Sequence, residues 1–166
     1  AEKNHSEMVV GSVARFNSKK DHVSNLHEIA FRKYIDKTHI TDNTDLIYDT
    51  TSWNKLILKE FWDRNHFEFP ERILYEDIPV TIPVHYLANN VTMVQDVCYR
   101  WRIRDGANKS ITQRADDFTN MRDRITVLRM VDKFFEENVK EQELWDAKYY
   151  KWLYIDLMIY VNNCIY

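Results

Sequence analysis

Leu-Tyr-Glu-Asp-Ile-Pro, residues 74–79, places two adjacent carboxylates directly before a helical pattern over 77–89. Asp77 suits the N-cap of that helix, because its side chain can accept a hydrogen bond from the first free backbone N–H groups. Pro79 suits the first turn, where no intrahelical donor is lost. Two interpretations follow. Either Asp77 caps the helix while Glu76 complements its positive end, or a carboxylate below a cleft acts as a general base.

A period-two pattern over 91–104 predicts a strand that is interrupted near Gln95-Asp96. One parity is apolar: Val91, Met93, Val97, Tyr99, Trp101 and Ile103. The other parity carries a row of three arginines, Arg100, Arg102 and Arg104. Their guanidinium groups lie about 6.6 Å apart on a strand. Such groups can bind phosphate bidentately. The alternative is a solvated strand face whose arginines pair with acidic residues.

Hydrophobic spacing predicts the remaining elements. They are a strand over 8–16, helices near 25–36 and 51–64, a polar loop over 37–45, and C-terminal helices over 116–135 and 141–162. The last helix is apolar on more than one face. That pattern predicts burial between layers or contact with another part of a larger protein.

Composition excludes several classes of protein. The 166 residues suit one domain, and 45% hydrophobic residues supply a core. A net charge of -3 argues against a general nucleic-acid binder. Cys98 and Cys164 form no disulfide framework, which favours a reducing compartment, and Cys98 is predicted to be an inert buried thiol. Residues 152–161 are too short and too polar to span a bilayer.

Trp53-Asn54-Lys55 offers a stacking surface, an amide and an ammonium in one short run. Together these groups can stack on a sugar and hydrogen-bond to it. The alternative is a core Trp53, a capping Asn54 and a solvated Lys55. The histidines form no zinc signature, and only His85, two turns beyond Asp77, has a position from which it could reach a ligand.

Taken in order, several runs resemble the C-terminal half of family 2 glycosyltransferases with the GT-A fold. These runs are residues 48–56 (Tyr-Asp-Thr-Thr-Ser-Trp-Asn-Lys-Leu), Phe61-Trp62, Phe69-Pro70-Glu71, residues 74–79, residues 99–104 and Ser110-Ile111-Thr112. The likeness extends over about residues 8–113. More narrowly, it is similar to bacterial teichoic-acid and polysaccharide glycosyltransferases, including the minor teichoic acid GgaB type.

The resemblance implies an inverting sugar transfer from a nucleotide-diphosphate donor, assisted by a divalent metal, Mn²⁺ or Mg²⁺. Asp77 matches the general base of the family, and Glu76 would flank the acceptor. The acceptor side would be lined by Trp53, Asn54 and Lys55. The basic groups near the donor diphosphate would be Arg100, Arg102 and Arg104.

The nucleotide-binding half of the family and its Asp-x-Asp metal motif are absent from this sequence. We therefore expect no metal ligand among these residues, no metal bound by this chain alone, and no turnover without the missing half. The start at Ala1 rather than Met favours a processed product or an excised part of a longer protein. The expected fold is α+β: residues 1–113 form part of a GT-A mixed sheet with flanking helices, and residues 114–166 form a helical extension.

The expected function is sugar transfer to a cell-wall or surface-polymer acceptor, such as teichoic acid, in the cytoplasm at the inner face of the membrane. The expected partners in a full-length enzyme are a nucleotide-sugar donor and a polymer acceptor, without nucleic acid. Peripheral membrane contact and a homodimer through an exposed sheet edge or the C-terminal helices are further expectations. The alternative is a non-catalytic carbohydrate or protein interaction module that uses the aromatic helix 141–162.

Overall fold

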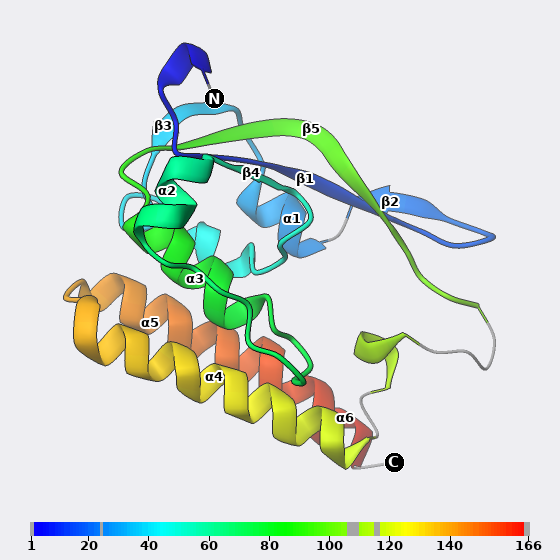
Figure 1. Ribbon diagram of the computed structural model, residues 1–166. Coiled ribbons are helices and arrows are strands. Elements are labelled where there is room, and N and C mark those ends of the chain that lie inside the picture. Colours follow the sequence, from blue (N-terminus) through cyan, green and yellow to red (C-terminus); the bar gives the residue numbers. More distant parts are fainter. Residues whose placement is uncertain (1, 24, 106–109, 115–116, 165–166) are drawn as a thin grey trace.

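The computed structural model describes residues 2–23, 25–105, 110–114 and 117–164. A curled mixed sheet forms one side of the molecule and a layer of helices the other (Figure 1). This arrangement confirms the expected α+β class. The sheet has the order β2-β1-β5-β3, and β4 pairs with the first part of β1. Its strands are β1 (Met8–Phe16), β2 (Asp21–Val23), β3 (Ile35–Thr38), β4 (Lys55–Ile57) and β5 (Val91–Arg102).

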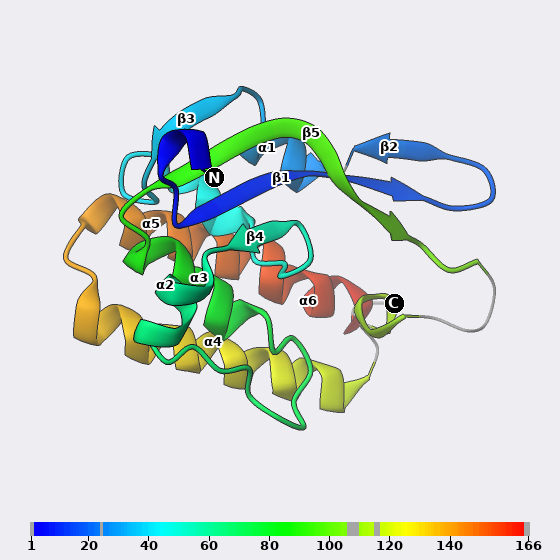
Figure 2. The same cartoon turned by 45° about the horizontal axis from the view of Figure 1, so that its top comes forward.

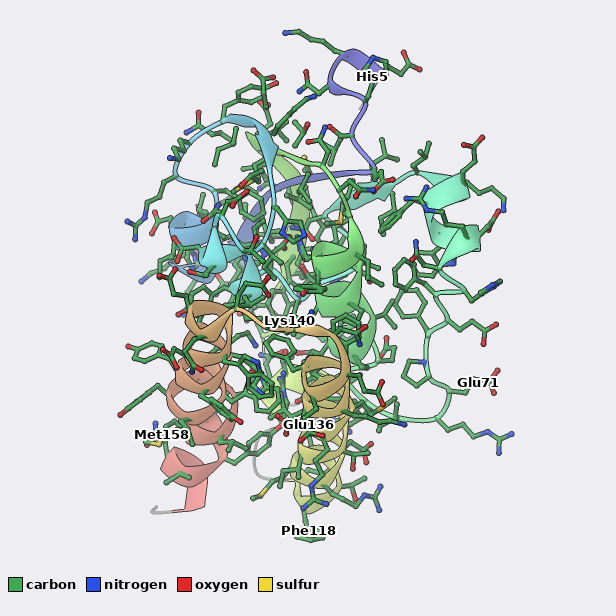
Figure 3. All side chains as sticks on the ribbon, turned by 90° about the vertical axis from the view of Figure 1, so that its left-hand side faces the viewer. His5, Glu71, Phe118, Glu136, Lys140 and Met158 are labelled. Carbon is green, nitrogen blue, oxygen red and sulfur yellow. The ribbon has the colours of Figure 1, made fainter. Side chains whose placement is uncertain are left out.

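The helices are α1 (Asn25–Ala30), α2 (Lys59–Arg64), α3 (Ile78–Leu87), α4 (Phe118–Asn138), α5 (Gln142–Lys151) and α6 (Met158–Cys164). A π-helical segment, Trp152–Leu157, joins α5 to α6, and short 3₁₀ turns lie at Glu2–Asn4, Thr44–Tyr48 and Ile111–Gln113. Helix α3 lies between the sheet and α4 (Figure 1, Figure 2). Figure 3 shows α4 and the following helix as an antiparallel pair joined by the turn at Lys140.

The central strands β1 and β5 run parallel, and a bulge interrupts their register. Gly11 faces Val94, whereas the next residue of β1, Ser12, faces Val97. The predicted interruption of the strand is therefore a bulge at residues 95–96 within one continuous strand, which is a common way to bend a sheet. A Cβ atom on Gly11 would lie 2.2 Å from the sulfur of Cys98, so a larger residue at this position requires the Cys98 side chain to move.

Beyond the bulge, β5 bends downward along the right-hand side of the molecule (Figure 1). The side chains before the bulge, Val91 and Met93, are fully buried, whereas Val97 and Tyr99 are exposed. The apolar parity of this strand is therefore fully buried only in its first half. Cys98 is exposed as well, which corrects the prediction of a buried thiol.

The core joins residues from both halves of the chain. Helix α3 is buried from Ile78 through His85, because the sheet covers one side and α4 the other. Its neighbours in the core include Val10 on β1, Val131 and Phe135 on α4. The C-terminal helices thus share one hydrophobic core with the sheet. Burial of this kind contributes about 25 cal/mol per Å² of apolar surface.

Two local predictions are wrong for one physical reason. The helix predicted over 25–36 ends at Ala30, and Ile35–Thr38 pairs with β5 across the predicted boundary between that helix and the loop over 37–45. The helix predicted over 51–64 begins only at Lys59, because Lys55–Ile57 pairs with β1. Short strands obtain their backbone hydrogen bonds from a distant partner, and local hydrophobic spacing carries no signal for such pairing.

Candidate functional site

Asp77 occupies the N-cap position of α3, but its carboxylate makes no capping hydrogen bond within the described residues. The side chain is half-buried and lines two neighbouring cavities. We call them the inner cavity, of about 190 Å³, and the outer cavity, of about 340 Å³. The capping interpretation thus fails for the side chain, which interacts with its own backbone amide and borders both cavities.

The inner cavity lies between the loop around Thr50, the start of α3 and the C-terminal helices. Its apolar and aromatic lining consists of Tyr48, Tyr75, Ile78, Trp101, Ile155 and Ile159. Its polar lining consists of Arg15, His27, Thr50, Thr51, Asp77, Thr112, Arg124, Lys151 and Asp156. A partly enclosed cavity with aromatic and apolar walls and converging polar groups is typical of a small-molecule site.

Three charged residues from the C-terminal helices form one wall of this cavity, and sequence reasoning missed all of them. Arg124 on α4 donates to Asp156 Oδ1 at 3.3 Å, and Lys151 donates to Asp156 Oδ2 at 2.6 Å. The guanidinium of Arg124 also lies 3.6 Å from the ring centroid of Tyr75. Arg124, Lys151 and Asp156 lie far from Asp77 in the sequence and belong to no motif, so the sequence did not indicate this wall.

Tyr75 is held in place on the other side by hydrogen bonds to α4 and α6. Its hydroxyl donates to Asn120 Oδ1, and Tyr160 donates to the same oxygen at 2.8 Å. Tyr75 also has a positive φ of 65°, a conformation that non-glycine residues adopt at a cost. The segment that leads into Asp77 is therefore fixed by packing against the C-terminal helices.

The environment of Asp77 changes its acidity. Burial, and next the charge of Glu76, raise the pKa of Asp77 to about 6, although Arg124 and Lys55 oppose the rise. Glu76 itself is exposed. A carboxyl group with this pKa is largely ionised at pH 7 and is a far better proton acceptor than an ordinary aspartate.

The predicted arginine row does not face the cavities as a unit. Arg100 pairs with Asp21 and lies over Phe16, and Arg102 occupies the same strand face at the exposed end of β5. Arg104 follows the strand and lines the outer cavity with Asp77. Alternation along β5 explains this result, because the cavity-facing parity belongs to Trp101, which lines both cavities.

Lys55 and Asn54 lie beneath the cavities rather than in them. The Lys55 ammonium, with a fully buried side chain, contacts Asp49 Oδ2 at 2.7 Å, Asn54 Oδ1 at 3.0 Å and the carbonyl of Thr51 at 2.5 Å. The Asn54 amide donates to Asp49 Oδ1 at 2.8 Å and to the carbonyl of Gly11 at 2.8 Å. These internal bonds occupy the groups that were expected to contact an acceptor.

Asp49 is the centre of this buried ion cluster, which we define as Asp49, Lys55 and His85. His85 Nε2 lies 3.2 Å from Asp49 Oδ2. Burial alone would raise the pKa of Asp49, but the charge of Lys55 and the hydrogen bond from His85 outweigh it and hold that pKa well below its usual range. Burial lowers the pKa of His85, so its imidazole is neutral at pH 7. His85, the histidine that was considered for a ligand contact, is thus in contact with Asp49.

Trp53 is the member of the Trp-Asn-Lys run that reaches a cavity. It lines the outer cavity and stacks on Tyr99 with ring centroids 4.1 Å apart. Trp101 lies beside it at 5.9 Å, and the guanidinium of Arg15 lies 4.5 Å from the Trp101 ring centroid. The outer cavity therefore has an aromatic wall, as sites that bind sugar rings commonly do.

The residues that the structure describes offer no group of three or more His, Cys, Asp or Glu side chains that could hold a metal ion. Among the same residues, no helix is both long and apolar enough to cross a membrane.

No protein-family model matches the chain, and no curated protein matches its sequence. Solved structures do match. Residues 1–349 of S. aureus TarS in complex with UDP superpose with a TM-score of 0.61 at 14% identity, over 95% of this chain and 41% of that one. The complex with UDP-GlcNAc gives 0.58 at 15% identity, over 97% and 48%. Longer S. aureus TarS gives 0.55 at 15% identity, over 88% and 23%.

The chain thus spans less than half the length of the structures it matches. At such low identity the likeness establishes a shared fold and nothing further. The α+β fold expected from the sequence is confirmed, and the similarity to glycosyltransferases, including the narrower GgaB type, stays a proposal.

Proposed function

We propose that this chain forms the acceptor side of an inverting glycosyltransferase, in which Asp77 is the general base. The observation that carries the proposal is the state of that carboxylate. It is half-buried, lines both cavities, makes no capping hydrogen bond within the described chain, and has a pKa near 6. A structural aspartate at a helix start would use its carboxylate oxygens to accept hydrogen bonds from backbone amides.

The proposed chemistry is one proton transfer coupled to one displacement. Asp77 takes the proton of an acceptor hydroxyl, whose oxygen forms a bond to the anomeric carbon of the donor sugar. The bond from that carbon to the diphosphate breaks, and the electron pair leaves with the diphosphate. Arg104, which lines the outer cavity with Asp77, would offset the charge that develops on the leaving group. Trp53 and Trp101 would stack on a sugar ring.

The proposed substrates are inferred from the likeness of this chain to TarS, not from contacts within this structure. TarS has been crystallised with UDP and UDP-GlcNAc, which supports a nucleotide-sugar donor for a longer protein that contains this chain. A teichoic-acid or other surface-polymer acceptor, the GgaB type and a place at the cytoplasmic face of the membrane are parts of the same proposal. Peripheral membrane contact, a divalent metal and a homodimer also stay predictions.

A second candidate function rests on the surface of the C-terminal helix. Tyr150 and Tyr154 are 56% and 65% exposed, and their ring centroids lie 4.8 Å apart. Leu153 beside them is 55% exposed. An exposed apolar stripe of this kind favours an interaction module. Loss of a protein partner in Tyr154→Ser, with unchanged transfer activity in the longer protein, would support it.

The proposed reaction is tested by Asp77→Asn in a longer protein that transfers sugar from UDP-GlcNAc. Asparagine keeps the shape and the N-cap propensity of the residue but cannot accept the proton. We expect the turnover rate to fall on the order of 10²–10⁴-fold. Asp63→Asn, an exposed carboxylate on α2, is the matched control and should transfer normally. Near-normal turnover by Asp77→Asn would remove the base from the proposal.

A further inference from the structure

We propose that Arg124 is a positioning residue for Asp77: this α4 guanidinium, fixed on the wall of the inner cavity, keeps the facing carboxylate ionised. The C-terminal helices would then belong to the reaction centre rather than form a separate extension. The catalytic meaning of this inference rests on the proposed function. The electrostatic effect itself does not, and it can be measured without any substrate.

The position of Arg124 is determined by three contacts. It donates to Asp156 Oδ1 at 3.3 Å, lies 3.6 Å from the ring centroid of Tyr75, and lines the inner cavity with Asp77. Its side chain is only 12% exposed. A charge that is fixed and mostly removed from water is weakly screened, so it acts on its neighbours more strongly than a surface arginine does.

Charge balance gives the reason for an interaction with Asp77. Arg124 and Lys151 share one carboxylate, Asp156, so this trio carries a surplus of one positive charge. A surplus charge in a buried setting is costly unless an opposite charge lies near. Asp77 is the other carboxylate on the wall of the same cavity, and its negative charge balances the trio.

The groups around Asp77 include others of both signs. Glu76 lies next to Asp77 on the same segment. The titratable and charged groups near Asp77 from other elements are Arg15, His27, Lys55, Arg104, Arg114, Lys151, Asp156 and the phenols of Tyr48 and Tyr75. Burial lowers the pKa of His27 to about 4, so its imidazole is neutral. Among the cations that oppose the raised pKa of Asp77, Arg124 ranks before Lys55. Lys55 is largely compensated by Asp49 at 2.7 Å.

Asp156 lies in the π-helical segment Trp152–Leu157. Single π-helical turns inside α-helices occur frequently at functional sites, because the wider turn changes where the following side chains lie. Here the segment places Asp156 where it holds both Arg124 and Lys151. This feature links the irregular helix to the cavity.

The test is a carboxyl ¹³C NMR titration of Asp77 in the full 166-residue chain. We expect a midpoint near pH 6 for the unchanged protein. Arg124→Met should raise it by about one pH unit, and Arg124→Lys should return it close to the starting value. Arg122→Met is the matched control, since Arg122 is exposed on the same helix and pairs with Asp123. An unchanged midpoint in Arg124→Met would overturn the proposal.

A second variant keeps the test decisive if Arg124→Met does not fold. Asp156→Asn removes the carboxylate that Arg124 and Lys151 share, so the trio gains positive charge and the Asp77 midpoint should fall. An Asp77 midpoint that rises or stays constant in Asp156→Asn would contradict the assigned role. In a longer active protein, the acid limb of transfer should follow the NMR midpoint in each variant. If the NMR midpoint of Asp77 moves in a variant but the acid limb of the transfer rate does not, the effect of Arg124 on Asp77 is upheld and Asp77 is rejected as the general base.

Discussion

Replacement of Asp49 by alanine tests whether the buried ion cluster is a structural support. The change would leave the fully buried Lys55 ammonium without the carboxylate oxygen 2.7 Å away. The Asn54 amide would lose an acceptor at 2.8 Å, and His85 would lose one at 3.2 Å. Removal of one partner from a buried charged pair costs about 3–5 kcal/mol, because the other charge stays buried and unpaired. We expect a loss of about 4 kcal/mol in the free energy of unfolding.

Urea unfolding at pH 7 measures this loss. With a slope of about 2 kcal/mol per M, the transition midpoint should fall by about 2 M. Asp63→Ala is the control, because it removes an exposed partner of Lys59 on α2, and should cost only about 0.3–0.5 kcal/mol. The double variant Asp49→Ala/Lys55→Met removes both charges and should recover much of the loss.

A loss below about 1 kcal/mol for Asp49→Ala would refute this reasoning. It would mean that water reaches Lys55 and compensates its charge. The ammonium would then be available to an acceptor, as the resemblance implied, and the description of Lys55 as a support beneath the site would be wrong.

The remaining predictions concern protonation. Asp77→Asn should raise the free energy of unfolding at pH 7 by up to about 3 kcal/mol. The reason is that the folded protein disfavours ionised Asp77, with a pKa raised from 3.8 to about 6; this gain should vanish as the pH falls through 6 to below 3.8, and an Asn variant that is no more stable at pH 7 would show that the fold does not disfavour the ionised carboxylate. His27 has a folded pKa lowered from 6.5 to about 4, so its contribution to stability is fully present above pH 6.5 and is lost as the pH falls toward 4. In denaturant titrations, His27→Phe should therefore gain about 3 kcal/mol relative to the unchanged protein between pH 7 and pH 4; a constant difference would show that His27 does not titrate as described.

The sequence predicted the elements whose hydrophobic pattern is long and self-contained. Strand β1, helix α3 and helix α4 were predicted within a few residues, because each presents many apolar groups to one core. Strands β3 and β4 were missed because only three or four residues form each one, and their hydrogen bonds come from β5 and β1. Local spacing cannot report a partner that lies elsewhere in the chain.

The same division applies to the site. Asp77 was predicted because its neighbours in sequence, a paired carboxylate and a helix start, are also its neighbours in space. Arg124 and Asp156 lie on helices whose charged residues are usually solvated, and nothing in their spacing distinguishes a cavity wall from a surface. Asp49 was not among the site residues predicted from the sequence. Its place directly before the Thr-Thr-Ser-Trp-Asn-Lys run is the one signal that could have indicated a partner for Lys55.

The account depends most on Asp77 as a proton acceptor, and the pH dependence of sugar transfer by a longer protein that contains this chain tests it most directly. With UDP-GlcNAc as donor and an alcohol acceptor, we expect kcat/KM to be constant near neutral pH and to fall tenfold per pH unit below about 6, as Asp77 becomes protonated. A rate that stays constant down to pH 4.5, or the same acid limb at undiminished rate in Asp77→Asn, would contradict the account.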